Sequence, residues 1–550
     1  GIVGGVVCGV VLHALATLAL GRLLRFATPF TAGLSLPAVI LTAVVFGALL
    51  VLALVINLGR VRLANPIELL RGGQVGEREP KTRWLTTVIG VAALGAGYAI
   101  ALTTVDPYSA IAFYFLAVLL VIIGTYCLFT AGSIALLKLL RKNKRYYYQT
   151  GHFIGVSGML YRMKRNAVGL ANICILSTMV MVMISGTLSL YLGTGEIINA
   201  QYPADFQIEV RYGENQEESF DPQAAVSLAE GFAKNQGLAV EDLRTVEYVS
   251  MNVSRDEYGG FLLATSSDRS LNRMAYLITA ADYAALSGQT APELAPGQAM
   301  VCGREVQPGS LTFYTVEGEE KSLEVAGQLP ELTYFSVTND TFAPVCLVVA
   351  DGQELSSWYR FQQPTADRDY RFLIFMDLDC TQEQALGLQA AWWDYTGDSM
   401  DVGGFNMLSV DTRVDMEVDG YAMAGGFLFL GILLGIIFLL ATALIIYYKQ
   451  VSEGYEDQGR FEIMRKVGLE ERQVRSSIRS QVLTVFFLPI LAAAIHILFD
   501  FNMVVQLLSL FAIRGVTVAA LCTAGTVLVF CLVYGAVYLL TARTYYKIVK

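Results

Sequence analysis

Long apolar runs separated by polar stretches dominate the pattern of this chain. Runs of about twenty apolar residues, the length of helix that crosses the roughly 30 Å hydrocarbon layer of a membrane, occur eight times. They lie near 1–21, 36–58, 85–104, 111–137, 168–193, 421–448, 481–499 and 512–541. A long water-soluble stretch separates the fifth run from the sixth. The pattern predicts an α-helical polytopic membrane protein with one large separate domain.

The water-soluble stretch, about 196–420, has the pattern of a mixed α/β domain. The segments ADFQIEVRY and APVCLVVAD are typical of strands, whereas DPQAAVSLAEGFAKNQG and TQEQALGLQAAWWDYTG predict helices. Trp392 and Trp393, in the last of these, are candidate ligand anchors, because aromatic side chains often carry binding energy. A helix that packs these aromatic rings inside the domain is the alternative. Asp377 and Asp379 have strand spacing and are interpreted as a solvated face.

The distribution of Lys and Arg predicts the orientation, because these residues accumulate in cytoplasmic loops. They are concentrated in 59–84, 138–167, 449–480 and the C-terminal segment, which alternate along the chain with loops that hold few basic residues. We therefore expect these segments and both ends of the given chain to be cytoplasmic. The domain at 196–420 is then extracellular.

Composition supports a membrane protein, and acidic and basic residues are unevenly distributed along the chain. Hydrophobic residues make up 54% of the chain and charged residues only 16%, and the net charge is −9. The segment 196–420 holds 37 Asp and Glu against 12 Lys and Arg, so the rest of the chain is basic. Such an acidic surface would attract cationic ligands, although it could equally serve only to keep the domain soluble.

Signals of catalysis are absent from the sequence. It has no phosphate-binding G-x-x-x-x-G-K-[ST] loop and no zinc-type spacing of His and Cys, so we expect no cofactor, no metal and no enzyme activity in this chain. Nothing suggests nucleic-acid binding. His13 and His496 lie within spans, where a neutral histidine bonded to a neighbouring helix is favoured over a proton relay. Two of Cys302, Cys346 and Cys380 could oxidise, but the sequence does not choose the pair.

A charged segment at about 453–480 lies between two of the apolar runs. Phe461, Met464 and Val467 recur at helical spacing, Gly468 interrupts the pattern, and LEERQVRSSIRSQ predicts a second helix that leads into the next span. A membrane-surface helix is one use for this pattern. A rigid lever whose apolar side fills the groove of a cytoplasmic motor is the other.

A second short helix is predicted in NPIELLRGG. Asn65 is a good N-cap, Pro66 suits the first helical position and Glu68 complements the positive end of the helix dipole. An interfacial anchor and a partner contact are equally compatible with it.

These two segments carry a resemblance. YEDQGRFEIMRKVGLEERQVRSSIRSQ resembles the loop after the first span of an FtsX-like permease unit, with Glu462, Ile463 and Gly468 at the family's acid, isoleucine and glycine positions and MRKVG in place of the more usual LRALG. NPIELLRGG resembles the close of the same unit. The resemblance implies that both segments contact an ATPase, and the residues implied are Phe461, Glu462, Met464, Arg465, Lys466, Gly468, Asn65, Pro66 and Glu68.

Two FtsX-like units around one exterior domain resemble the bacitracin-resistance (BceB-like) ABC transporter permeases, and YRMKRNAVGLANICILSTMVMVMISGTLSLY is similar to their span entering that domain. That family has ten spans, so the first unit here would lack its first two helices. The implied domains are 1–84, the end of the first unit; 85–195, three intervening spans; 196–420, the extracellular domain; and 421–550, the second unit with its coupling helix at about 453–480.

The resemblance also implies a function. The chain would be a permease in a bacterial plasma membrane, working with two cytoplasmic ATPase subunits that bind the ATP, and signalling through a membrane histidine kinase. Its ligand would be a cationic peptide antibiotic or a lipid-linked cell-wall precursor. The alternatives are a lipoprotein-release or macrolide-efflux transporter with an FtsX-like unit, a secondary transporter and a receptor without transport.

Overall fold

The computed structural model describes residues 2–549 of the chain. Within these limits, the residues that it does not describe are 25–35, 64–83, 106, 148–149, 212–220, 256–260, 264–271, 303–308, 316–317, 333–344, 362–368, 398–400, 403–404, 467–470, 512 and 514. The chain divides into two compact units. The first comprises Gly1–Ser189, Gly425–Gln506 and Val516–Lys550, and the second comprises Leu190–Ala424 and Leu507–Gly515.

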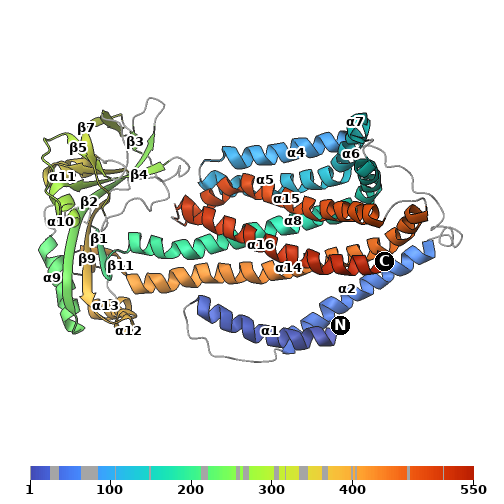
Figure 1. Cartoon of the computed structure of the whole chain (residues 1–550). Helices are drawn as coiled ribbons and strands as arrows, with labels where there is room; N and C mark the ends of the chain where they lie inside the picture. The colour runs from blue at the N-terminus through green and yellow to red at the C-terminus, as the bar shows by residue number, and fades with distance from the viewer. Residues whose placement is uncertain are drawn as a thin grey trace. The chain divides into compact units, whose positions relative to one another are not determined.

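The first unit is built from helices (Figure 1). The helices that contribute to it are α1 (Ile2–Leu23), α2 (Leu36–Leu63), α4 (Trp84–Thr103), α5 (Pro107–Cys127), the π-helical turn η1 (Leu128–Gly132), α6 (Ser133–Lys142), α7 (Lys144–Tyr147), α8 (Thr150–Gln201), α14 (Arg413–Lys466), α15 (Glu471–Ser509) and α16 (Val516–Val549). In the described residues, eight helices are long and apolar enough to cross a membrane, which confirms the predicted spans.

The interior of the first unit is apolar and lies mainly between α8, α14, α15 and α16. Its buried residues include Leu170, Ile173, Met181, Ile446, Phe486, Ile490, Ala493, Phe530 and Tyr534. Many large apolar side chains of α2 and α4 point outward instead, such as Leu41 and Leu85. Exposed apolar surface on this scale suits a lipid environment, where helices satisfy their own backbone hydrogen bonds.

His496 of α15 has hydrogen-bond partners on two other helices. Its Nδ1 lies 2.6 Å from the Tyr98 hydroxyl of α4, and its Nε2 lies 3.0 Å from the Thr125 hydroxyl of α5. Asn502, two turns along α15, donates to the carbonyl oxygens of Ala101 and Thr104 at 2.9 Å each. Polar contacts therefore join α15 to the α4–α5 pair, as the prediction of a histidine bonded to neighbouring helices required.

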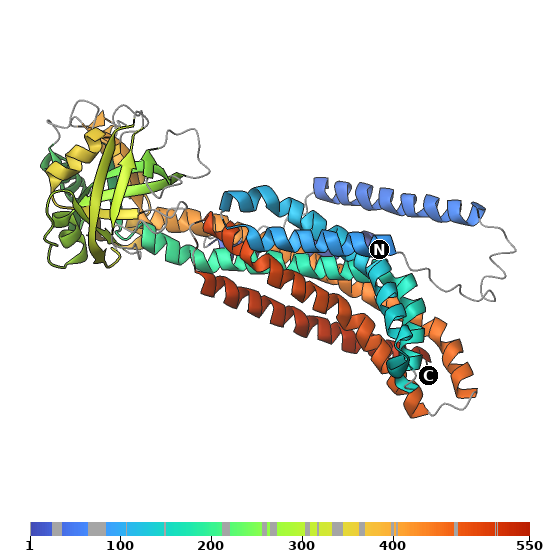
Figure 2. The same ribbon diagram turned by 90° about the horizontal axis from the view of Figure 1, so that it is seen from above.

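The second unit contains a mixed sheet. Its strands are β1 (Phe206–Arg211), β2 (Ala239–Arg255), β3 (Phe261–Leu263), β4 (Asn272–Thr279), β5 (Gln298–Cys302), β6 (Ser310–Tyr314), β7 (Glu320–Leu329), β8 (Val345–Val349), β9 (Asp369–Asp379), β10 (Asp401–Val402) and β11 (Phe405–Thr412). The order is β10-β11-β1-β9-β2-β3-β6-β7-β5-β8-β4 among the described strands. β2 also pairs with β4, so the pairings from β2 to β4 close on themselves. Figure 2 shows the same sheet from a second direction.

Helices cover the sheet and complete two apolar cores. These helices are α9 (Pro222–Asn235), α10 (Ala280–Ser287), α11 (Gly352–Phe361), α12 (Gln382–Ala385) and α13 (Leu388–Thr396). Successive residues of β9 contribute to different cores, Phe372 and Ile374 to one and Leu373 and Phe375 to the other, because alternate side chains of a strand point to opposite faces. β9 is therefore buried on both faces.

Most of the element predictions for this domain are confirmed, with one correction. ADFQIEVRY and APVCLVVAD contain β1 and β8, and DPQAAVSLAEGFAKNQG contains α9, whose N-cap Asp221 accepts a hydrogen bond from the Gln223 amide at 3.0 Å. The segment at 381–397 is not one helix. Gly387 adopts a φ of +114°, which L side chains rarely allow, and this turn separates α12 from α13.

Candidate functional site

Two long helices enter and leave the sheet domain through neighbouring strands. α8 ends at Gln201, and four residues separate it from β1, which pairs antiparallel with β11; β11 leads directly into α14. Phe206 of β1 pairs with Thr412, the last residue of β11. The end of α8 and the start of α14 are therefore fixed to adjacent strands of one sheet.

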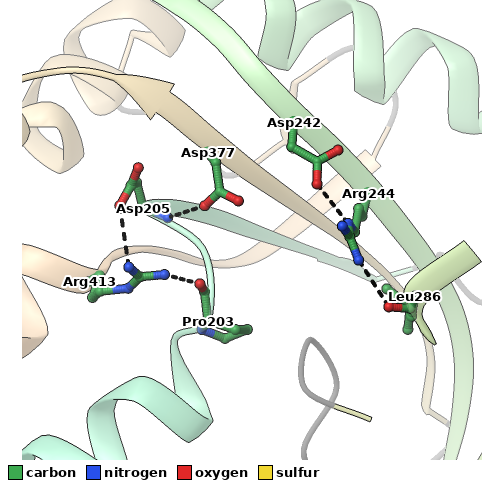
Figure 3. Close-up of polar contacts among 7 residues, drawn as sticks. All are labelled: Pro203, Asp205, Asp242, Arg244, Leu286, Asp377 and Arg413. Atoms are coloured by element: carbon green, nitrogen blue, oxygen red, sulfur yellow. Dashed lines mark hydrogen bonds and ion pairs between the residues drawn. The ribbon is translucent and has the colours of Figure 1, made fainter. Parts of the chain in front are cut away.

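Arg413, the first residue of α14, binds the chain that follows α8. Its Nε donates to the Tyr202 carbonyl oxygen at 2.9 Å. Figure 3 shows its other two contacts: the guanidinium donates to the Pro203 carbonyl oxygen, and Nη1 lies 3.6 Å from a carboxylate oxygen of Asp205. Carbonyls at the end of a helix lack partners within that helix. A cation in this position also suits the negative end of the helix dipole.

Asp205 joins this group to the sheet. One of its carboxylate oxygens accepts the Leu378 amide of β9 at 3.1 Å, and its own amide donates to the Asp377 carboxylate at 3.3 Å. Its carbonyl oxygen accepts the Arg413 amide at 3.1 Å. Asp377 is therefore a hydrogen-bond partner within the domain. We call Asp205, Asp377 and Arg413, with the carbonyls of Tyr202 and Pro203, the junction.

A second local motif fixes the start of α14. The Thr412 hydroxyl accepts the Asp415 amide at 3.0 Å and donates to the Asp415 carboxylate at 2.6 Å. This is the arrangement of an N-cap, which satisfies one of the amides left unpaired at the beginning of a helix. The direction in which α14 leaves β11 is therefore set by short-range hydrogen bonds.

Burial affects the ionisable groups beside the junction. Burial, together with the negative charges of Asp411 and Glu209, raises the pKa of Tyr202 to about 12. Burial also raises the pKa of Asp411. Glu209 forms an ion pair with Arg371 at 2.7 Å and accepts the Tyr248 hydroxyl. The tyrosines near the junction therefore stay neutral in the physiological range.

Within the second unit, α8 and α14 pack closely beside the junction. A Cβ added at Gly420 of α14 would lie 3.1 Å from the side chains of Thr194 and Ile198 on α8. The rings of Tyr191 and Tyr421 meet edge to face, with their centroids 5.3 Å apart. Gly420 lets the two backbones approach to a distance that a larger residue would prevent.

The same two helices pack closely within the first unit as well. A Cβ at Gly431 would lie 2.7 Å from the Thr187 hydroxyl oxygen, and one at Gly435 would lie 2.8 Å from a methyl carbon of Ile184. Further along, the Lys449 ammonium donates to the Asn166 carbonyl oxygen at 3.2 Å. Contacts between α8 and α14 thus recur in each unit.

α14 extends without interruption from the junction to Lys466, a length of 54 residues. It contains the expected span at 421–448 and the first part of the expected coupling helix. Gly454 packs against Tyr545 and Ile548 of α16, which fixes this region of α14 to the first unit. One helix therefore connects the sheet domain to the segment that resembles an ATPase contact.

Comparison with known proteins shows that the chain is similar to several permeases. No family model matches it. It is 24% identical over 458 residues to the ABC transporter permease protein YxdM of Bacillus subtilis, covering 80% of this chain and 65% of that protein. It is 23% identical over 512 residues to the bacitracin export permease protein BceB of Halalkalibacterium halodurans, covering 90% and 74%. The chain is homologous to ABC transporter permeases.

The match to BceB of Bacillus subtilis is 22% over 392 residues and covers 68% of this chain and 55% of that protein. For YxdM, the chain covers 65% of the relative's length, which is somewhat less than two thirds. Permease homologues, together with the eight apolar helices found among the described residues, identify a multi-pass protein of the cell membrane.

The side chains of the predicted ATPase contacts lie outside the described residues. α14 carries Phe461, Glu462, Met464, Arg465 and Lys466, but their side chains lie outside the described residues. Gly468, Asn65, Pro66 and Glu68 also lie outside them. Their contact with an ATPase therefore stays a prediction.

The two tryptophans proposed as ligand anchors differ in how deeply they are buried. Trp392 is 1% exposed, and its ring lies 5.0 Å from that of Phe232 and 5.7 Å from that of Phe206, measured between centroids. It belongs to the domain core, as the alternative interpretation held. Trp393 packs partly against the same core, and its role in binding stays a prediction. In the described part of the chain, no group of three or more His, Cys, Asp or Glu could hold a metal ion.

Of the junction residues, the sequence singled out only Asp377, and it was interpreted as part of a solvated face rather than as a partner of Asp205. Signals for other residues near the junction exist. Thr412 and Asp415 have the spacing of an N-cap. Gly431 and Gly435 form a small-x-x-x-small pattern within a span, which is typical of close helix packing. Asp205 and Arg413 are more than two hundred residues apart, and no local pattern links such a pair.

Proposed function

We propose that the chain is the membrane permease subunit of an ABC transporter, in which α8 and α14 transmit movement between a cytoplasmic ATPase and the sheet domain. The observation that carries the proposal is the continuity of α14. It runs from the junction at Arg413, through a span, to Lys466 in the segment that resembles a coupling loop. A continuous helix resists bending and stretching far more than a loop does, so displacement at one end moves the other.

The distribution of basic residues supports an orientation of the chain in the membrane. Basic loops favour the cytoplasmic side, which leaves the acidic domain at 196–420 outside the cell. ATP is bound by two separate ATPase subunits, because the chain has no phosphate-binding loop of its own. The segments at 65–73 and 455–481 are the contacts for these subunits, as their resemblance to FtsX-like units suggests.

The ligand is a cationic peptide antibiotic of the bacitracin type or the lipid-linked cell-wall precursor that such a peptide captures. Homology to bacitracin export permeases supports this choice, and the acidic composition of the domain favours a cationic partner. A membrane histidine kinase is the further partner that the resemblance implies.

Copurification tests the proposal. The full-length protein is expressed with its partners at native levels, extracted in mild detergent and assayed for ATP hydrolysis with and without a cationic cell-wall peptide. We expect an ATPase to copurify and its rate to change when the peptide binds. Extraction of a stable protein without an ATPase, under conditions that preserve a known ABC transporter in parallel, would contradict the proposal.

A further inference from the structure

Two cysteines face each other across neighbouring strands of the sheet. β5 and β8 pair antiparallel, and Cys302 lies directly opposite Cys346 in their register. Side chains at such opposed positions point to the same face, with Cβ atoms about 4.5–5.5 Å apart. The separation of their Cα atoms, about 4.5–5.5 Å, also falls within the range that a disulfide bridges.

Burial places both sulfur atoms in one apolar cluster. Cys302 is 6% exposed and Cys346 is 1% exposed, and both belong to the core that includes Tyr283, Val348 and Phe375. A side-chain hydrogen bond between Cys346 and Cys302, together with burial, raises the pKa of the Cys346 thiol well above its ordinary value. Both thiols are therefore shielded from water.

Cys380 is not a competitor for this pairing. It follows β9, whose partners are β1 and β2 rather than β5 or β8. Its side chain is partly exposed and packs against the other apolar core. Of the three cysteines in the domain, the geometry selects Cys302 and Cys346 and leaves Cys380 unpaired.

We propose that Cys302 and Cys346 form a disulfide bond in the mature protein. The opposed register and the shared burial carry this proposal. An oxidising environment for the pair rests on the proposed extracellular location of the domain, because disulfides persist outside the cytoplasm.

The chemistry needs an oxidant, and a low-molecular-weight disulfide such as glutathione disulfide is sufficient. One cysteine thiolate attacks it, forms a mixed disulfide and releases one thiol. The second cysteine then attacks the mixed disulfide, forms the bond between Cys302 and Cys346 and releases the second thiol. Two cysteine thiols are thereby oxidised, and one glutathione disulfide is reduced to two thiols.

The burial of the pair determines when the bond forms. A thiol with a raised pKa is rarely ionised and reacts slowly, so oxidation precedes the final packing of β5 against β8. After packing, the same burial protects the bond from external thiols. The native protein should therefore resist mild reductants and lose the bond only when the domain unfolds.

Peptide mapping tests the proposal directly. Cells are quenched with N-ethylmaleimide, and the full-length protein is purified without reductant and digested with trypsin. We expect residues 274–304 to be recovered covalently linked to residues 322–360, with the link lost after denaturation and reduction. Recovery of both cysteines as maleimide adducts would overturn the proposal.

Stability measurements give an independent readout. Because the bond closes a loop, the Cys302→Ser/Cys346→Ser double variant should unfold about 5–10 °C below the wild type in non-reducing buffer. Full reduction of the unfolded wild type should remove that difference on refolding. Cys380→Ser is the matched control and should leave both the linked peptide and the unfolding temperature unchanged.

Labelling of Cys380 separates failure of this proposal from failure of the proposed orientation. A membrane-impermeant maleimide is applied to intact and to permeabilised cells, with Cys380→Ser as the blank. Labelling in intact cells supports the extracellular location, and free Cys302 and Cys346 in the same cells would then overturn the disulfide alone. Labelling only after permeabilisation would overturn the extracellular location.

Discussion

At the scale of single residues, Arg413 shows how one side chain links several elements. It binds carbonyl oxygens that follow α8, pairs with Asp205 and begins α14. Arg244 makes comparable contacts elsewhere in the domain, donating to the Asp242 carboxylate at 2.7 Å and to the Leu286 carbonyl oxygen at 2.9 Å (Figure 3). The two arginines differ mainly in what they connect, which makes Arg244 a natural control.

Asp282, at the start of α10, gives a pH prediction. Burial raises its pKa from 3.8 to about 6, against the opposing hydrogen bonds from Thr279. The folded state therefore binds this proton more tightly than the unfolded state does. The resulting stabilisation is fully present below about pH 4 and is lost as the pH rises through 6.

Asp282→Asn keeps a polar partner for Thr279 but cannot titrate. We expect its unfolding temperature to fall less than that of the wild type between pH 4 and pH 6.5, by about 2–4 °C. Thermal unfolding of the purified protein across this range measures the difference. Parallel pH profiles of the two proteins would show that Asp282 does not titrate with a raised pKa.

At the scale of elements, the sequence predicted what depends on local pattern. The spans follow from runs of apolar residues, and β8 and α9 follow from short-range periodicity. The break between α12 and α13 was missed because a single glycine, Gly387, changes the backbone direction inside an otherwise helical pattern. The junction was missed because Asp205 and Arg413 meet only after the sheet has formed.

The contact between α8 and α14 in the first unit gives a prediction about packing. Leucine at Gly431 or Gly435 would overlap Thr187 or Ile184, so Gly431→Leu and Gly435→Leu should each separate the helices and lower activity several-fold. Gly426→Leu on the same helix is the matched control, because a Cβ there meets no atom within 4 Å. Ligand-stimulated ATP hydrolysis in the purified complex measures the effect, and equal losses in all three variants would argue against a specific role for this contact.

The end of α14 gives a prediction about the ATPase. Reversing the charges of Glu462 and Arg465 should weaken binding of the ATPase while leaving the protein in the membrane, since charged contacts at a surface depend on complementary signs. Copurification from cells and drug protection in the same strain measure the result. Unchanged protection by the Glu462→Arg/Arg465→Glu variant would count against the lever interpretation.

At the scale of the whole molecule, the sheet domain and the membrane helices have separate proposed tasks. In the proposed function, the acidic domain binds a cationic ligand, while the apolar helices span the membrane. α8 and α14 belong to both compact units, and each unit holds them together by its own contacts.

The most direct test of transmission compares Arg413→Ala with Arg244→Ala in the purified complex. Ligand-stimulated ATP hydrolysis is measured for each variant, together with ligand binding and basal hydrolysis. If the junction transmits movement, Arg413→Ala should retain binding and basal hydrolysis but lose most of the stimulation, about fivefold or more, whereas Arg244→Ala should behave like the wild type. Full stimulation in a folded Arg413→Ala variant would contradict the proposal that the junction joins the sheet domain to α14 as a mechanical unit.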